Sequence, residues 1–174
     1  IYLEMSVDVE GGWRLERSVL LLPKDKVVLL ADAIVVPALK YGDQSEMLAA
    51  QLHLQSCLCV TPSVAVNPCE ETCEVFGTDG QPRFLAIQLA LKEWRESYRG
   101  EGSLNVSGQQ LELKQNTEAG RLYAPLWFDC HAERLKRLQE QSEYNQRTWR
   151  QLTVADTREV MRADQAVSFR VQSC

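Results

Sequence analysis

The sequence predicts an all-β protein, an antiparallel β-sandwich of the supersandwich-like kind with about 8 to 11 strands. In most stretches of the chain, apolar and polar residues alternate with the two-residue period of a half-buried strand. Proline, glycine and charged turn residues separate these stretches at short spacing. Only one stretch has a helical composition, so we expect one short helix or loop insertion among the strands.

The first predicted hairpin consists of two apolar runs joined by a polar turn. The run from Trp13 to Leu22 alternates, as a strand does when it begins half exposed. The run from Val27 to Val36 is almost wholly apolar and rich in β-branched residues, which is typical of a central strand buried on both faces. Pro23 cannot donate a hydrogen bond in a sheet, and the charged residues that follow it favour solvent. The two runs are therefore predicted to pair in antiparallel fashion.

Further strands are expected in six stretches that show the same alternation or a hairpin signal. These stretches are residues 51–60, 83–94, 103–115, 119–130, 148–156 and 165–174. Ser107-Gly108 lies between two alternating runs and predicts a tight turn. Pro125 predicts an edge strand or a bulge. The stretch from His131 to Tyr144 has the helical composition, and its thin apolar stripe predicts a surface turn of helix or a loop.

The length and charge of the chain limit how many domains it can form and which classes of partner it can bind. A chain of 174 residues without a low-complexity linker predicts a single domain, residues 1–174, and the start at Ile1 suggests a processed protein or a fragment of a longer chain. A net charge of -5 argues against nucleic acid, because phosphate binding requires clustered Lys and Arg. No apolar run approaches the roughly 18 residues that cross a bilayer, so no membrane partner is expected. The cellular compartment stays open.

Six cysteines and two histidines are the candidates for metal or thiol chemistry. Cys57 and Cys59 share one strand face near His53, and two thiolates with a histidine could hold zinc, but the spacing is not that of paired zinc knuckles. Disulfides and free thiols remain the alternatives. Asp129-Cys130-His131 could assist acid–base chemistry. Because three consecutive strand residues cannot all face one substrate atom, the favoured interpretation is a polar cluster where the strand enters a loop. Because no catalytic motif is present, we expect no catalytic residue, metal ligand or cofactor, and enzyme activity of the isolated chain is not favoured.

Aromatic and basic residues on the predicted sheet faces are the candidates for ligand binding. Aromatic rings can stack on sugar rings, and neighbouring polar side chains can bind hydroxyl or acidic groups. The alternative is that the tryptophans fill the core or cover a sheet edge. The candidate substrate-binding residues are Trp13, Arg14, Arg17, His53, Tyr123 and Trp127.

The stretches WRLERSVLLLPKDKVVLLADAIV, LHLQS, RLYAPLWFDCH and TWRQLTVAD resemble the β-rich carboxy-terminal region of heparinase II/III-like polysaccharide lyases. Some members of that family bind zinc in this region through two histidines and an aspartate. Asp32 and His53 could occupy two of these places, but the strand from Trp13 to Arg17 has no histidine for the other. The catalytic Tyr and His of the family lie largely on a preceding α-helical toroid, which this chain does not contain.

Two functions follow as hypotheses. The first is an accessory β-sandwich domain of a carbohydrate-active, polysaccharide lyase-like protein, which binds an acidic polysaccharide through Arg14, Arg17 and His53. The alternative is a non-catalytic structural or protein-interaction β-sandwich, in which an exposed apolar face docks onto a neighbouring domain of the same chain. Within the first hairpin, Arg14, Arg17 and Asp32 are the residues that folding does not obviously require.

Overall fold

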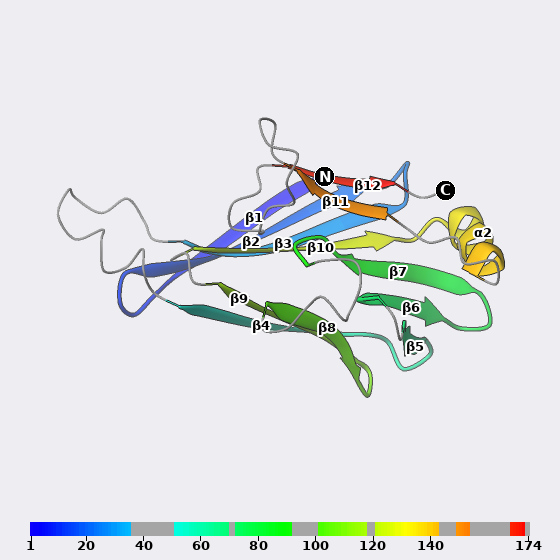
Figure 1. Cartoon of the computed structure of the whole chain (residues 1–174), viewed down its shortest axis with the longest axis horizontal. Coiled ribbons are helices and arrows are strands. Elements are labelled where there is room, and N and C mark those ends of the chain that lie inside the picture. Colours follow the sequence, from blue (N-terminus) through cyan, green and yellow to red (C-terminus); the bar gives the residue numbers. More distant parts are fainter. Residues whose placement is uncertain are drawn as a thin grey trace.

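The computed structural model describes residues 1–35, 51–69, 72–91, 101–117, 121–142, 149–153 and 168–172. Most of these residues lie in antiparallel strands, which form a seven-stranded sheet, a three-stranded sheet and a separate two-stranded pair (Figure 1). The described part of the chain also contains one helix. The predicted all-β, sandwich-like fold is confirmed.

The seven-stranded sheet has the strand order β1-β2-β3-β10-β7-β6-β5, and every pair in it is antiparallel. Its strands are β1 (Tyr2–Val9), β2 (Trp13–Leu22), β3 (Val27–Val35), β10 (Leu122–Asp129), β7 (Pro82–Gln88), β6 (Glu74–Thr78) and β5 (Ala65–Pro68). The three-stranded sheet has the order β4-β9-β8, and its strands are β4 (Leu52–Cys59), β9 (Gln110–Thr117) and β8 (Gly102–Ser107). The two-stranded pair consists of β11 (Trp149–Thr153) and β12 (Ser168–Gln172).

The predicted first hairpin is confirmed as the pair β2 and β3, in which Leu22 lies opposite Val27. The four residues between them form the turn, and Lys26 closes it in the left-handed region with φ of 57°. Strand β3 is buried or half-buried along its whole length, as its apolar composition predicts. Val36, which the prediction included in this strand, lies outside the described residues.

Most of the other expected strands also form. The stretches 51–60, 83–94 and 103–115 overlap with β4, β7 and the hairpin of β8 and β9, although β7 ends at Gln88 and residues 92–94 lie outside the described residues. Ser107 pairs with Gln110, so the turn residues are Gly108 and Gln109, and Gly108 has the positive φ of 57° that a tight hairpin turn favours at its first position. The last two expected stretches contain β11 and β12. Strands β1, β5 and β6 were not among the predicted elements.

Pro125 was expected to mark an edge strand or a bulge, but β10 is an interior strand between β3 and β7. The N–H of Leu89 donates to the Pro125 carbonyl at 3.0 Å. The reciprocal bond that continues an antiparallel ladder requires an N–H at Pro125, which proline lacks. Pairing between β10 and β7 therefore begins only at Leu126, opposite Gln88. Proline is accommodated here because the neighbouring strand ends beside it.

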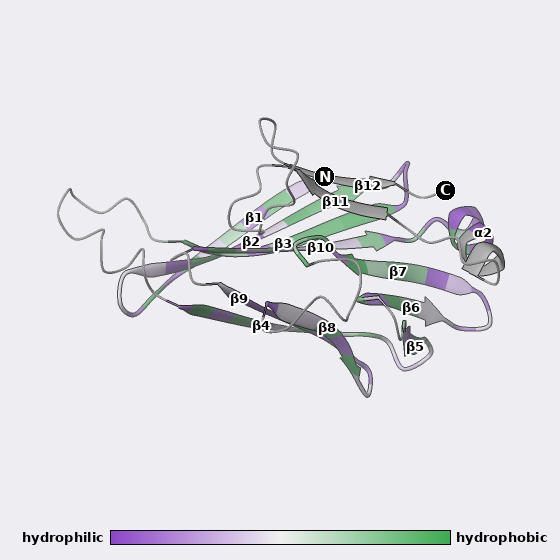
Figure 2. Ribbon diagram, in the orientation of Figure 1, coloured by the Kyte–Doolittle hydropathy of each residue, from purple (hydrophilic) through white to green (hydrophobic). Residues whose placement is uncertain are grey.

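Each face of the seven-stranded sheet contributes to its own hydrophobic core. The inner face is the one that packs against the three-stranded sheet, and the outer face is the opposite one. The core between the sheets is formed by buried residues of both, and Figure 2 shows the hydrophobic positions along their strands. Its largest fully buried members are Leu91, Leu104, Leu111, Leu122, Leu126 and Val75. The core on the outer face contains Leu85, Ile87, Leu89 and Leu135, with Leu29, Phe76 and Trp127 packed against them.

Helix α2 (Ala132–Ser142) follows β10 and covers part of the outer face beside β7 (Figure 1). The sequence predicted a surface helix or loop with too thin an apolar stripe to bury much. The helix is confirmed, but Leu135 is fully buried in the outer core. One leucine is sufficient to dock the helix because the sheet supplies the apolar surface around it.

Candidate functional site

The two facing sheets are unequal in width, and the difference leaves part of the inner face of the larger sheet uncovered. Leu3, Val19, Leu30 and Leu126 occupy one row across β1, β2, β3 and β10, so their side chains lie on the same face. Leu126 is 0% exposed, whereas Leu3 is 52% exposed. The three-stranded sheet covers the row at β10 but does not extend over β1.

The uncovered surface is a continuous apolar strip. Odd-numbered residues of β1 and its amino-terminal neighbour point to the inner face, and Leu15 of β2 lies opposite Val7 in the same row. We call this surface the open strip, formed by Ile1, Leu3, Met5, Val7, Val9 and Leu15, all of which are exposed. Among the described residues, the only other exposed large apolar side chain is Tyr2. Hydrophobic positions continue into β1 in Figure 2.

The boundary of the covered region is held by a polar contact between the sheets. The Arg17 guanidinium of β2 donates to both carboxylate oxygens of Asp32 on β3, at 2.6 and 2.8 Å. The same guanidinium donates to the Ser56 hydroxyl of β4 at 2.9 Å. The three-stranded sheet therefore meets the larger sheet at β2 through its edge strand β4, and the open strip begins beyond this contact.

Among the described strands, β1 also presents an unpaired backbone edge, since it ends the strand order of its sheet. Ile1 and Leu21 exchange two backbone hydrogen bonds, at 2.8 and 2.9 Å. Because backbone groups of successive residues point to alternate sides of a strand, the odd residues of β1 face β2 and the even residues face outward. The outward N–H and C=O groups belong to Tyr2, Glu4, Ser6 and Asp8. The pairing of β1 with β2 contains no bulge that would protect this edge.

The outer face of β1 is polar, as is the part of β2 from Arg14 to Ser18 that lies beside it. The Tyr2 hydroxyl donates to Glu4 at 2.8 Å and lies 3.3 Å from the Ser18 hydroxyl. The Arg14 guanidinium donates to Asp8 at 2.7 Å. This hydrogen bond and the attraction between the charges lower the pKa of Asp8 and raise the pKa of Arg14. The two faces of β1 therefore differ sharply, since one is apolar and the other is polar.

The six predicted binding residues do not share one surface. Trp13 and Arg17 belong to the inner face of the larger sheet, at the side of the open strip. Arg14, Tyr123 and Trp127 belong to its outer face, where Trp127 packs into the core beneath α2. Burial raises the pKa of Tyr123, and the nearby Tyr2 adds to the rise. His53 lies on the solvent face of the three-stranded sheet. A single platform that contains all six is not formed.

Asp32 and His53, the two residues that the resemblance places in a zinc site, do not converge. Asp32 is buried between the sheets and bound by Arg17, whereas His53 is exposed and lies 2.8 Å from the side-chain oxygen of its cross-strand neighbour Asn116. Within the described part of the chain, no group of three or more His, Cys, Asp or Glu side chains lies close enough to hold a metal ion. Cys57, Cys59, Cys73 and Cys130 hold free thiols, and Cys174 lies outside the described residues.

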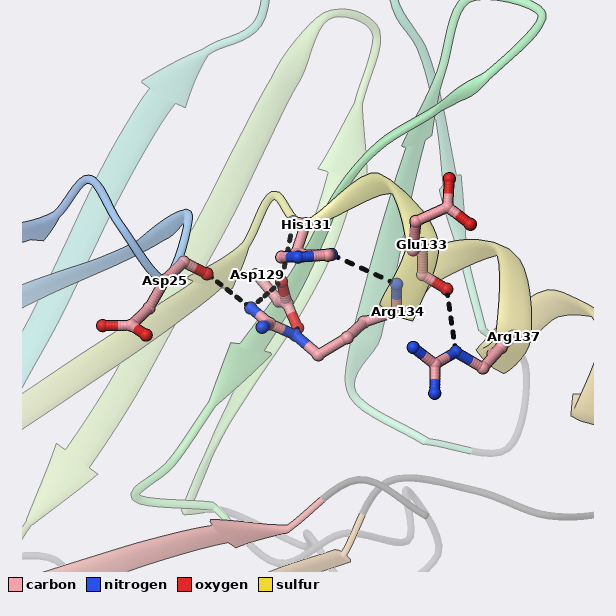
Figure 3. Close-up of polar contacts among 6 residues, drawn as sticks. All are labelled: Asp25, Asp129, His131, Glu133, Arg134 and Arg137. Atoms are coloured by element: carbon pink, nitrogen blue, oxygen red, sulfur yellow. Dashed lines mark hydrogen bonds and ion pairs between the residues drawn. The ribbon is translucent and has the colours of Figure 1, made fainter.

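The Asp129-Cys130-His131 cluster organises the start of helix α2 (Figure 3). Arg134 donates to both carboxylate oxygens of Asp129 at 2.8 Å and to the Asp25 carbonyl at 2.6 Å. The backbone N–H of His131 donates to Asp129, and His131 Nδ1 accepts from the backbone N–H of Arg134 at 3.4 Å. Asp129 and His131 thus satisfy backbone donors at the helix start. Burial and the charge of Asp129 raise the pKa of the Cys130 thiol.

The open strip was missed in the sequence, although its signal is present there. In the opening residues IYLEMSVDV, every odd position is apolar and the even positions after Tyr2 are polar. This is the pattern of a strand with one apolar face. The pattern predicts a strand but not that its apolar face stays uncovered, which depends on the width of the other sheet.

No protein-family model and no curated protein matches this chain. The resemblance to heparinase II/III-like lyases therefore rests on the quoted sequence stretches alone. Within the described residues, no helix has both the length and the apolar character needed to cross a membrane.

Proposed function

We propose that this chain is a non-catalytic protein-interaction β-sandwich that docks through the open strip onto another protein surface. The observation that carries the proposal is the contrast within one row of the inner face, where Leu126 is covered and Leu3 is not. Contiguous apolar surfaces of this kind on a folded domain mark interaction sites, because leaving them in water is unfavourable.

Two features support docking of a protein rather than binding of a small ligand. The open strip follows a regular strand along its full length, so it offers an elongated apolar surface rather than a few convergent polar groups. The adjacent backbone edge can add hydrogen bonds to an incoming strand, which is a common way in which sheet edges bind protein partners. The charged residues beside the strip, Arg17 and Asp32, are paired with each other. Arg17 also binds Ser56 of the other sheet, so this pair holds the two sheets together.

The test is to make the open strip polar and measure its exposure with a hydrophobic dye. The double variant L3T/V7T should bind less of a dye such as ANS than the unchanged chain and should scatter less light at high concentration. Its thermal stability should stay close to that of the unchanged chain, because both side chains are already exposed and contribute little burial.

Ser6 provides the matched control, since it lies on the same strand but points to the opposite face. The variant S6T should bind as much dye as the unchanged chain. If the unchanged chain binds no dye and remains monomeric, the strip is not available for docking and the proposal is wrong.

A further inference from the structure

We infer that the protein docked at the open strip is a second copy of this chain, whose β1 pairs antiparallel with β1 along its free edge across a two-fold axis at Met5, so that the two open strips lie side by side. The inference deepens the proposed function and rests on it. It follows from three properties of β1: the direction of its free backbone groups, the alternation of its side chains and the positions of its charges.

The free backbone groups allow such pairing. Tyr2, Glu4, Ser6 and Asp8 point their N–H and C=O groups away from β2. In antiparallel pairing about Met5, Glu4 of one copy lies opposite Ser6 of the other, and Tyr2 lies opposite Asp8. Each of these pairs can exchange two hydrogen bonds, so all the outward groups of the strand are satisfied.

The side chains also match in this register. Directly opposed residues of an antiparallel pair lie on the same face, so Leu3 meets Val7 and Met5 meets Met5. Ile1 meets Val9 at the two ends of the paired region. The open strips of the two copies thereby join into one apolar surface on the inner face, with the three-stranded sheet of each copy at its two sides.

The charges on β1 favour the register about Met5 over the two registers in which the axis is shifted by one residue. Shifting the axis by one residue toward the amino terminus places Glu4 opposite Glu4, and shifting it by one residue the other way places Glu4 opposite Asp8. Like charges directly opposite one another destabilise a strand pair. The register about Met5 has no directly opposed like charges, and it also pairs the strand over its whole length.

The first experiment is disulfide trapping with cysteine at two positions of equal exposure. Met5 is 45% exposed and Val9 is 46% exposed, and both point to the inner face. Two Met5 positions form a pair without backbone hydrogen bonds, with Cα atoms about 4.5 Å apart, which suits a disulfide. Two Val9 positions lie roughly 26 Å apart along the strands. With Cys57, Cys59 and Cys130 replaced by Ser, M5C should form a disulfide-linked dimer on mild oxidation, whereas V9C should not.

The second experiment removes one outward N–H and measures association by sedimentation velocity. The Ser6 N–H points away from β2, so S6P keeps the hydrogen bonds between β1 and β2, whereas it removes a donor from each side of the dimer. The unchanged chain and S6A should dimerise, and S6P should weaken dimerisation by at least about tenfold.

Three results would overturn the inference: a monomer at all concentrations, linkage of V9C as efficient as that of M5C, or unchanged dimerisation of S6P. The dye measurement separates these results from failure of the proposed function. A monomer that still binds dye through the open strip has a docking surface for a different protein, whereas a monomer that binds no dye contradicts both proposals. If S6P loses its fold by circular dichroism, the comparison of M5C with V9C decides alone.

Discussion

Arg17 and Asp32 face each other across β2 and β3, and two hydrogen bonds of 2.6 and 2.8 Å join the guanidinium to the buried carboxylate. In the sequence these two residues looked dispensable for folding and available for a ligand. In the structure they form an ion pair with a third contact to Ser56 of the other sheet. The hydrogen bond to Asp32 raises the pKa of Arg17 despite partial burial, so the guanidinium stays charged.

Replacing Arg17 with Ala is therefore expected to destabilise the fold. The Asp32 carboxylate is 4% exposed, and removing its partner leaves a buried charge without compensation. We expect the free energy of unfolding to fall by about 1 to 3 kcal/mol, less than for a fully buried pair because the Arg17 side chain is partly exposed. Urea unfolding at constant m-value measures the loss.

Arg14 is the matched control for this measurement. Its side chain has the same 38% exposure as that of Arg17, but its partner Asp8 is 70% exposed. R14A should shift the urea midpoint much less than R17A, because water replaces the lost contact to Asp8. Equal shifts for the two variants would show that burial of Asp32 does not determine the loss.

Replacing Leu135 with Ala is expected to loosen helix α2. Leu135 is fully buried, and its removal leaves a cavity among Leu85, Ile87 and Leu89. Substitutions of this kind cost about 2 to 5 kcal/mol. Urea unfolding of L135A measures the loss, and the exposed neighbour Lys136 serves as control through K136A. A loss below that of K136A would contradict docking of the helix through this leucine.

The Cys130 thiol is expected to react at higher pH in the folded chain than in the unfolded chain. Burial first, and then the charge of Asp129, raise the pKa of the folded thiol. At a pH between the unfolded and folded pKa values, the unfolded chain holds more thiolate, so stability declines as the pH rises through this window. The measurement is the rate of iodoacetamide labelling of Cys130 against pH, with the urea-unfolded chain as reference. A midpoint at or below that of the reference contradicts the expectation.

The polysaccharide hypothesis makes a separate prediction that can be tested at Arg14. If Arg14 binds an acidic polysaccharide, R14A should elute from heparin at lower salt than the unchanged chain, because the contact is ionic. Arg83 is the control, since it also forms an exposed ion pair, with Asp79 at 2.7 Å, and its loss changes the net charge equally. Equal elution of R14A and R83A would leave no role for Arg14 beyond its charge.

The local elements of this fold were largely predictable because they follow from neighbouring residues. The alternation around Trp13 to Leu22, the turn after Pro23 and the apolar run that follows were sufficient to predict the β2–β3 hairpin. The composition after His131 predicted a short helix or a loop at the place where α2 forms. In each case the signal is a local preference of the backbone or the side chains, and this preference does not depend on tertiary contacts.

The sequence by itself thus determined the period of the strands, the places of several turns and the antiparallel sheet class. Only the tertiary structure decided that Leu126 is covered whereas Leu3 is not, that Leu135 is buried, and that Arg17 is held by Asp32 and Ser56. These outcomes depend on which segments distant in the chain lie against each other. The alternation of apolar and polar residues shows that a strand has an apolar face, but the width of the facing sheet determines whether water reaches that face.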